Sequence, residues 1–230
     1  MRFLVLATDY DGTLATDGRV DGKTLQALLR LRNGGRKLVM VTGRHLPDLR
    51  GVFPDLDLFD RVVVENGGLL YDPATGAETL LCGPPDARLV ATLQARKIPF
   101  VLGRTIIATW RPHEAATVSA IRDLGLDQQV ILNKGSVMVL PSGVDKATGL
   151  QATLDEMGIA PQNVVSVGDA ENDFSFLEMS GCSVAVANAV QSLKEQADVV
   201  LQTARGEGVT ELIDQILADD LAKFETKLAT

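Results

Sequence analysis

Two carboxylates stand at positions 9 and 11, directly after a short apolar run near the start of the chain. The run Phe3–Thr8 has the composition of a buried strand, and Asp9-Tyr10-Asp11-Gly12-Thr13 follows it at once. In an open α/β sheet, ligands bind beyond the carboxyl ends of the strands. An aspartate placed there can attack phosphorus, and a second carboxylate can donate and accept the proton. The alternative is an Asp/Gly loop that only ends a strand.

Two further segments carry groups that could bind a phosphate. Thr42 and Gly43 stand at the end of a predicted strand, and a hydroxyl with the next amide can bind a phosphate oxygen there. Lys146 begins a predicted helix, where a cation opposes the helix dipole and so suggests a bound anion. Taken singly, each has an ordinary structural explanation: a helix-capping threonine and an exposed lysine.

A second group of acids follows a later strand. Gly168-Asp169-Ala170-Glu171-Asn172-Asp173 comes after the predicted strand Asn163–Val167. Carboxylate oxygens suit Mg²⁺, which proteins hold through one or two carboxylates together with substrate phosphate and water. Asp and Glu are also favoured in the first turn of a helix, which is the alternative explanation.

These four segments fall at the same end of the predicted sheet. Three acids gathered there would repel one another unless a cation lay between them. A lysine and a hydroxyl would then face the phosphate. Together the segments predict a phosphoryl-transfer site with a metal, a nucleophile, a cationic clamp and an acid/base group.

The remaining pattern predicts an α/β fold. Short apolar runs alternate with longer amphipathic stretches, which is typical of βαβ units and a parallel sheet covered on both faces. Leu69–Tyr71 and Thr79–Leu81 flank turn residues and predict a hairpin. The other predicted strands are Phe3–Thr8, Lys37–Thr42, Arg61–Glu65, Asn163–Val167, Ser183–Ala187 and Asp198–Leu201, and the predicted helices are Asp21–Asn33, Lys146–Met157, Glu171–Met179, Ala189–Gln196 and Gly208–Leu217.

The middle of the chain has a different pattern, between a Gly83-Pro84-Pro85 linker and Pro141-Ser142-Gly143. The helices expected there are Asp86–Arg96 and Glu114–Leu124, and the strands are Pro99–Leu102, Ile106–Trp110, Val130–Asn133 and Ser136–Leu140. We therefore expect a small α+β domain at residues 83–142, inserted into a core domain made of residues 1–82 and 143–230. The polar tail after Asp219 is expected to fray.

Composition narrows the choice of partners. The chain has 230 residues, 46% of them hydrophobic and 23% charged, which is ordinary for a globular protein and excludes a disordered one. Its net charge of −8 and the lack of a basic cluster argue against nucleic acid and anionic membranes. Cys82 and Cys182 have no metal-like spacing, and no apolar run is long enough to span a bilayer. We expect a cytoplasmic monomer or homodimer that acts on a small molecule.

In their order along the chain, these segments resemble the motifs of the haloacid dehalogenase-like (HAD) hydrolase superfamily, in its Mg²⁺-dependent phosphatase branch. The resemblance covers essentially the whole chain. Glu65-Asn66-Gly67, Gly143-Val144-Asp145-Lys146 and the place of the insertion are similar to the subgroup with Cof-type sugar phosphatases, sucrose- and trehalose-phosphate phosphatases, archaeal phosphoglycolate phosphatases and phosphomannomutases. This implies a Rossmann-like core with a small C2-type cap.

The resemblance also implies roles for the acids and the lysine. Asp9 would be the nucleophile and a Mg²⁺ ligand. Asp11 would be the general acid and base, with its main-chain carbonyl on the metal. Asp169 would bind Mg²⁺ directly, and Asp173 would bind it through water or orient Lys146.

Other residues would hold the substrate. The resemblance places Thr42, Gly43, Lys146 and Asn172 on the phosphate. We expect the inserted domain to close over the site, exclude water and select the substrate. The cations expected to touch the substrate are Arg44 beside Gly43, and Arg104 and Lys134 in the insertion, although a solvent-exposed turn is the plain alternative for the last two.

The leading hypothesis is a Mg²⁺-dependent phosphomonoester hydrolase that acts on a small metabolite, such as a sugar phosphate or phosphoglycolate, through an aspartyl-phosphate on Asp9. A phosphosugar mutase would use the same acids, but it must retain and reorient a bisphosphate, and the small insertion argues against that. A non-catalytic binding module is the third possibility, and the intact set of acids, hydroxyl and lysine argues against it.

Overall fold

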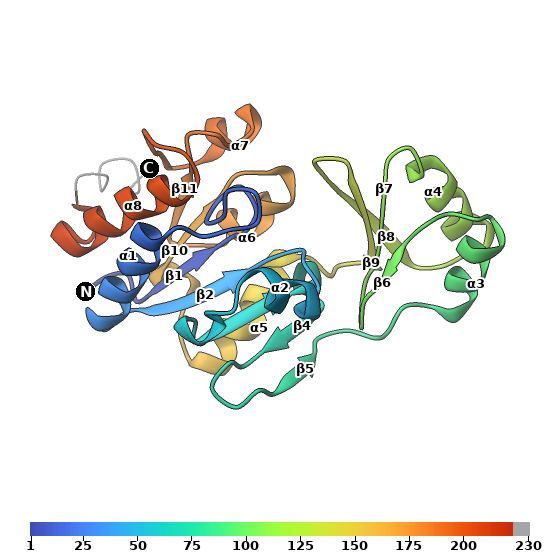
Figure 1. The fold of residues 1–230 in the computed structure, drawn as a ribbon, viewed down its shortest axis with the longest axis horizontal. Helices are drawn as coiled ribbons and strands as arrows, with labels where there is room; N and C mark the ends of the chain where they lie inside the picture. Colours follow the sequence, from blue (N-terminus) through green and yellow to red (C-terminus); the bar gives the residue numbers. More distant parts are fainter. Residues whose placement is uncertain (223–230) are drawn as a thin grey trace.

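The computed structural model describes residues 1–222, whose elements form two groups (Figure 1). Residues 223–230, most of the tail expected to fray, lie outside the described residues. Within the described part, one sheet of eight strands is built from the segments before residue 83 and after residue 142, and one sheet of four strands from the segment between them. The mixed α/β architecture with a parallel core confirms the predicted fold class.

The large sheet has the strand order β12-β11-β10-β1-β2-β3-β4-β5. Its strands are β1 Val5–Thr8, β2 Lys37–Val41, β3 Arg61–Val64, β4 Leu69–Tyr71, β5 Glu78–Leu80, β10 Val164–Gly168, β11 Cys182–Ala185 and β12 Val199–Val200. The pairs from β12 to β3 are parallel, and β4 and β5 are antiparallel, as the predicted hairpin requires. β1 lies between β2 and β10, so it occupies the middle of the sheet.

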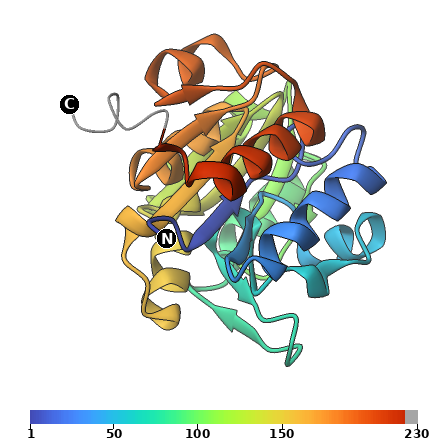
Figure 2. The same ribbon diagram turned by 90° about the vertical axis from the view of Figure 1, so that its left-hand side faces the viewer.

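Helices cover both faces of this sheet, which explains why its central strands are continuous apolar runs rather than alternating ones. Every residue of β1 and of β10 is buried. α1 (Gly22–Asn33) and α8 (Arg205–Asp219) lie side by side on one face, and α5 (Lys146–Met157) and α6 (Phe174–Glu178) lie on the other (Figure 2). The remaining helices outside the middle segment are α2 Leu46–Val52 and α7 Gln191–Gln196.

The middle segment forms an antiparallel sheet of order β6-β7-β9-β8, with two helices on its outer side (Figure 1). We call it the small unit. Its elements are α3 Ala87–Ala95, β6 Val101–Leu102, β7 Ile107–Trp110, α4 Glu114–Asp123, β8 Gln128–Asn133 and β9 Ser136–Pro141. Leu89 and Leu93 of α3 pack with Ile107 and Val139 of the sheet. A separate cluster, which includes Met138, gives this small sheet a second apolar surface.

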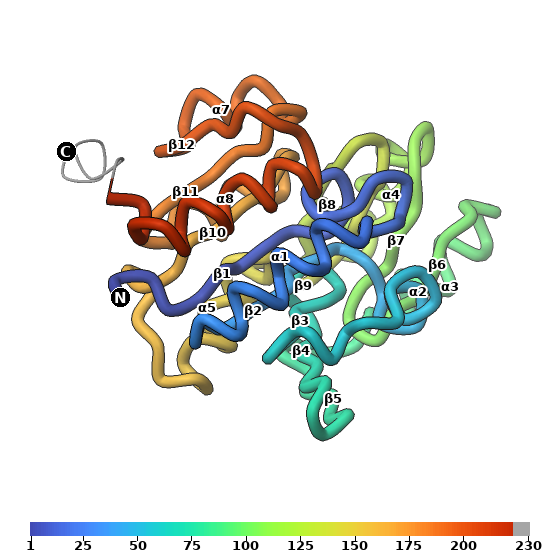
Figure 3. Tube along the Cα trace, turned by 60° about the vertical axis from the view of Figure 1, so that its left-hand side comes forward, coloured from blue at the N-terminus to red at the C-terminus, as the bar shows by residue number. Residues whose placement is uncertain are grey.

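The turn between β8 and β9 lies beside the segment that follows β1 (Figure 3). A Cβ atom at Gly12 would lie 2.7 Å from Lys134 Nζ, which measures how closely the two segments approach. Because β1, β2 and β10 are parallel, the residues after them meet at one edge of the large sheet, and the small unit faces that edge.

Two local features differ from the expected pattern. The predicted helix Glu171–Met179 begins as a 3₁₀ turn before α6, since the Asp173 carboxylate accepts hydrogen bonds from the amides of Asp169 (2.8 Å) and Ala170 (2.9 Å) and folds the turn back. α2 was not expected, because its seven residues include a proline and a glycine. Proline fits the first turn of a helix, and buried Leu46 and Leu49 anchor it.

Gly149 lets α5 approach the 3₁₀ turn Glu65–Gly67. A Cβ atom there would lie 2.6 Å from Val63 Cγ1 and 2.7 Å from Gly67 Cα. We expect Gly149→Ala to lower the free energy of unfolding by about 1–3 kcal/mol through overpacking. The matched change Gly51→Ala in α2, where a new Cβ has no neighbour within 4 Å, should raise it by about 0.5–1 kcal/mol. Urea unfolding measures both, and shifts of the same sign would contradict the close helix contact.

Candidate active site

Strand ends bring Asp9, Thr42 and their neighbours to one cavity between the large sheet and the small unit. The other predicted core residues do not line it, and these are Lys146, Asp169, Asn172 and Asp173. Asp9 follows β1, Thr42 follows β2, and Asp169 follows β10. The cavity has a volume of about 480 Å³. It is lined by Asp9, Asp11, Gly12, Ala15, Asp17, Gly18, Thr42, Gly43, Arg44 and Arg205 from the larger part, and by Ala108, Asn133, Lys134, Ser136 and Met138 from the small unit.

Lys146 is the buried cation of the site. Its Nζ donates hydrogen bonds to Asp9 Oδ1 and Asp173 Oδ1, both at 2.6 Å, and its side chain is 1% exposed. Burial opposes its charge, but the adjacent Asp173 and Asp9 carboxylates outweigh that effect and raise the pKa of Lys146. Asp145 caps α5 through a capping box, which fixes the start of the helix at Lys146.

The pKa of the Asp9 carboxyl is raised. Burial away from water is the main cause, Lys146 opposes it, and the neighbouring Asp173 and Asp169 carboxylates add to it. The pKa of Asp169 is also raised by burial, against the opposing contact with Lys134. Clustered carboxyl groups with perturbed pKa values are typical of functional sites.

Asp9, Asp169 and Asp173 could hold a cation. One carboxylate oxygen from each lies within 4.8 Å of the others, and all three residues are buried. Hard oxygen donors of this kind fit Mg²⁺. The Lys134 ammonium contacts Asp169 Oδ2, and the Asn188 amide donates to the same oxygen at 3.3 Å, so this acid is already oriented.

Asp11 lies at the edge of this group. Its side chain is not among the three clustered carboxylates, and it accepts two hydrogen bonds from Arg44, from Nε at 2.6 Å and from Nη2 at 2.8 Å. Arg44 Nη1 also donates to Asp48 at 2.6 Å. The Tyr10 hydroxyl donates to Gly18 O, and the tyrosine is buried in the core, so it leaves the cavity to the two acids.

The expected phosphate-binding residues lie close by. Thr42 is buried, and its hydroxyl accepts from the amide of Arg44 at 3.2 Å. A Cβ at Gly43 would lie 3.2 Å from Met138 Sδ, so the small unit approaches the backbone there. The Asn172 amide donates to Asn66 Oδ1 at 3.1 Å, and the other amide atom of each asparagine has no partner among the described residues.

Arg104 is not brought to this cavity. Its guanidinium donates to Glu78 at 2.5 Å and lines a separate cavity. The buried Glu65 carboxylate fixes the segment by accepting from the Arg104 amide (3.0 Å) and from the amide and hydroxyl of Thr105 (both 2.7 Å). Arg104 was expected to touch the substrate, but it does not line this cavity, because the Glu65 carboxylate holds its backbone elsewhere.

Sequence reasoning missed Asn188 and Arg205. The Asn188 amide donates to Gly12 O at 2.8 Å, and Asn188 Oδ1 accepts from the Arg205 amide at 2.9 Å. Asn188 follows a predicted strand, so the rule that found Asp169 could have found it as well. Arg205 is the first residue of α8 and belongs to no motif, and no sequence signal marks it.

Of the described helices, none combines the length and the apolar character needed to cross a membrane.

Comparison with known families gives a match over most of the chain. The family model described as haloacid dehalogenase-like hydrolase matches residues 6–82 and 128–213. The matched ranges contain Asp9, Thr42, Lys146 and Asp169, and they leave out most of the small unit.

Individual relatives agree with this match. The chain is 30% identical over 223 residues to a phosphoglycolate phosphatase of Natronomonas pharaonis. The aligned region covers 91% of this chain and 96% of that protein. The chain is 33% identical over 221 residues to a phosphoglycolate phosphatase of Methanothermobacter thermautotrophicus, covering 92% and 98%. A haloacid dehalogenase-like hydrolase from Bacteroides thetaiotaomicron superposes with a TM-score of 0.78 at 19% identity, covering 93% of this chain and 99% of that one.

Removing the buried cation should destabilise the protein. We expect Lys146→Met to lower the free energy of unfolding by about 3–5 kcal/mol, because it leaves two buried carboxylates without a counter-charge. Lys23→Met, at an exposed position of α1, is the control and should change it by less than about 0.5 kcal/mol. Urea unfolding at neutral pH measures both, and equal effects would show that the buried ion pairs contribute nothing to stability.

Proposed function

Because the chain belongs to the haloacid dehalogenase-like hydrolases, and within them is a phosphatase, we propose that it hydrolyses a small phosphomonoester through an aspartyl-phosphate on Asp9. The observation that carries this proposal is the position of Asp9. Its carboxylate lies at a cavity wall, 2.6 Å from a buried ammonium group and beside two further buried acids.

The proposed substrate is phosphoglycolate or a similarly small phosphorylated acid. Two relatives with 30% and 33% identity over nine-tenths of the chain are phosphoglycolate phosphatases. The cationic side chains Arg44, Lys134 and Arg205 line the cavity, which suits a substrate with a second negative group better than a neutral sugar.

In the first step, an Asp9 oxygen attacks the phosphorus in line with the leaving oxygen. The bond from phosphorus to the substrate oxygen breaks, and that oxygen takes its electron pair and a proton from Asp11. We propose that the Thr42 hydroxyl, the Gly43 amide and the Lys146 ammonium bind the phosphoryl oxygens, where negative charge must be balanced.

In the second step, water attacks the aspartyl-phosphate. Asp11, now ionised, accepts the proton of the water, and the bond between phosphorus and the Asp9 oxygen breaks. Inorganic phosphate leaves, and Asp9 regains its carboxylate. Asp11 lies two residues from the nucleophile and is held by Arg44, so the protein controls the orientation of its acid/base group.

We further propose that Mg²⁺ is the cation of the site. Asp9, Asp169 and Asp173 would hold it, together with the main-chain carbonyl of Asp11, and their oxygens are the donors that this ion prefers. When bound, a divalent cation neutralises the charge on the phosphoryl oxygens. Lys146 would act alongside this cation, because its positive charge balances the negative charges of Asp9 and Asp173.

The small unit is proposed to be a cap. Residues 83–142 would form this cap domain, on a core domain of residues 1–82 and 143–230. Asn133, Lys134 and Met138 line the cavity from the small unit, which supports a role in excluding water and touching the substrate. The Glu65 carboxylate ties the cap to the core at Thr105.

We also propose a cytoplasmic location and no nucleic-acid partner. Cys82 and Cys182 are free thiols in the described structure, which suits a reducing compartment. The net charge of −8 disfavours binding to a polyanion.

Asp9→Asn tests the nucleophile. We expect kcat for phosphoglycolate to fall by about 10⁴-fold or more, because the amide cannot form the acyl-phosphate. Phosphate release measures the rate, and circular dichroism with urea unfolding checks that the variant is folded. A folded variant with a rate near that of the wild type would exclude Asp9 as nucleophile.

Metal removal tests the cation. Protein treated with EDTA and dialysed should release no phosphate, and added Mg²⁺ should restore the rate. Ca²⁺ should restore it poorly, since its longer and more variable coordination does not keep the octahedral geometry of Mg²⁺. Full activity in protein shown by elemental analysis to be free of divalent metal would contradict the proposed cofactor.

A further inference from the structure

We propose that Arg205 is a specificity-determining residue that binds a second anionic group, a carboxylate, on a substrate whose phosphoryl group lies at Asp9. The inference rests on the proposed phosphatase function, and it names the residue that distinguishes phosphorylated acids from neutral phosphomonoesters. Arg205 lines the same cavity as Asp9 and Thr42 and is partly exposed there.

The other cations at the site already have carboxylate partners. Lys146 joins Asp9 and Asp173, Arg44 joins Asp11 and Asp48, and Lys134 joins Asp169. Arg205 forms no ion pair with any residue that the structure describes. In a chain with a net charge of −8, a cation without an internal carboxylate, facing a cavity, is available to a ligand.

The backbone at Arg205 is held in place. Its φ of +53° lies in the left-handed region, which costs a residue with a side chain energy, so surrounding contacts must maintain it. Its amide donates to Asn188 Oδ1 at 2.9 Å, and the Asn188 amide donates to Gly12 O at 2.8 Å. A Cβ on the following Gly206 would meet Thr24 Oγ1 and Leu14 O, so the first turn of α8 cannot shift inward.

The same asparagine connects Arg205 to the catalytic acids. The Asn188 amide donates to Asp169 Oδ2 at 3.3 Å, so the Arg205 backbone is two hydrogen bonds from a proposed metal ligand. A guanidinium fixed at that place can form a bidentate pair with a substrate carboxylate. A neutral group at the same position of the substrate cannot form this pair. The cavity would therefore prefer substrates that carry a negative charge at the end away from the phosphorus.

The test compares two substrates that differ only at that end. Phosphoglycolate carries a carboxylate where ethyl phosphate carries a methyl group. We expect Arg205→Gln to lower the ratio of kcat/KM for phosphoglycolate to that for ethyl phosphate about ten- to a hundredfold, the contribution of a charge-assisted hydrogen bond. Arg205→Lys should recover part of the ratio, since lysine keeps the positive charge but cannot donate two parallel hydrogen bonds to a carboxylate.

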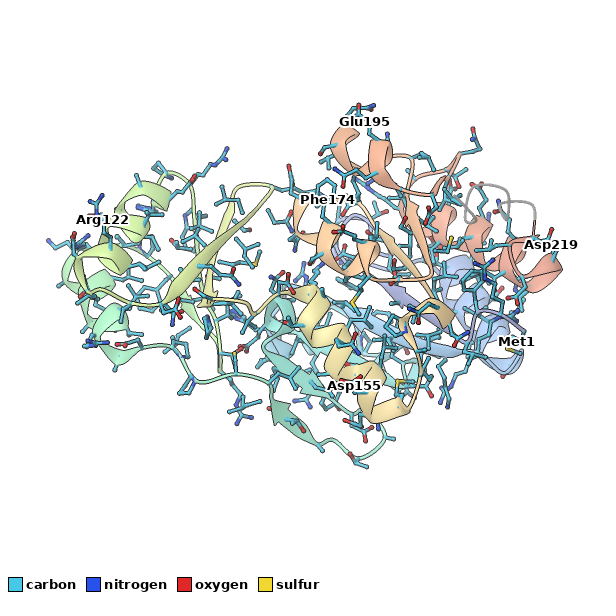
Figure 4. The ribbon with its side chains drawn as sticks, turned by 180° about the vertical axis from the view of Figure 1, so that it is seen from behind. Met1, Arg122, Asp155, Phe174, Glu195 and Asp219 are labelled. Atoms are coloured by element: carbon cyan, nitrogen blue, oxygen red, sulfur yellow. The ribbon has the colours of Figure 1, made fainter. Side chains whose placement is uncertain are left out.

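Arg205→Gly controls for folding. Glycine adopts a φ of +53° without strain, so this variant keeps the backbone and loses only the side chain. It should lower the ratio as Arg205→Gln does. Arg122→Gln is the matched control on α4, at the end of the small unit away from Met1 and Asp219 (Figure 4), and it should keep the wild-type ratio. A ratio within about twofold of the wild type in both Arg205 variants, or an equal loss on both substrates, would overturn the assignment.

A binding measurement separates this inference from the proposed function. Calorimetry on Asp9→Asn protein, with and without Arg205→Gly, gives the affinity for phosphoglycolate relative to ethyl phosphate. If the wild type hydrolyses neither compound, the proposed function fails. A preference for phosphoglycolate that Arg205→Gly removes would still support the carboxylate site, and a preference that it leaves intact would refute it.

Discussion

The ammonium group of Lys146 lies inside the protein between two carboxylates, 2.6 Å from Asp9 and 2.6 Å from Asp173. Burying a charge at that depth is unfavourable unless it is paired, and the lysine and the two acids provide that pairing for one another. This triad requires α5 to begin at one fixed point beside β1. The capping box of Asp145 and the close contact at Gly149 meet that requirement, so the fold and the site depend on the same charges.

Both sheets contribute residues to the site, and each contributes a different kind of residue. The large sheet supplies Asp9 and Asp169 from the ends of parallel strands, and backbone amides fix the Asp173 carboxylate near them. The small unit supplies Lys134 and Met138 from the β8–β9 hairpin, and both line the cavity. The Glu65 carboxylate, which accepts three hydrogen bonds from the segment Arg104–Thr105, fixes where the two units meet.

Prediction from sequence worked where one rule sufficed. Residues after parallel strands must meet at one edge, so Asp9, Thr42 and Asp169 could be grouped before any contact was known, and the structure brings them together. Prediction failed where a residue distant in sequence determines which way a side chain or a backbone segment faces. Arg104 faces Glu78 because Glu65 turns its backbone, and Arg205 reaches the cavity because Asn188 holds its amide. Local pattern can mark Glu65 and Asn188, but it does not show which distant segment each of them holds.

The most direct test of the central claim is to locate the phosphoryl group on the enzyme during turnover. Protein quenched while it hydrolyses phosphoglycolate would be treated with borohydride, which reduces an aspartyl-phosphate to homoserine, and then sequenced by tandem mass spectrometry. The account predicts homoserine at position 9 and unmodified Asp11. Modification of another acid, or none under conditions that trap the intermediate of a known aspartyl-phosphate enzyme, would contradict it.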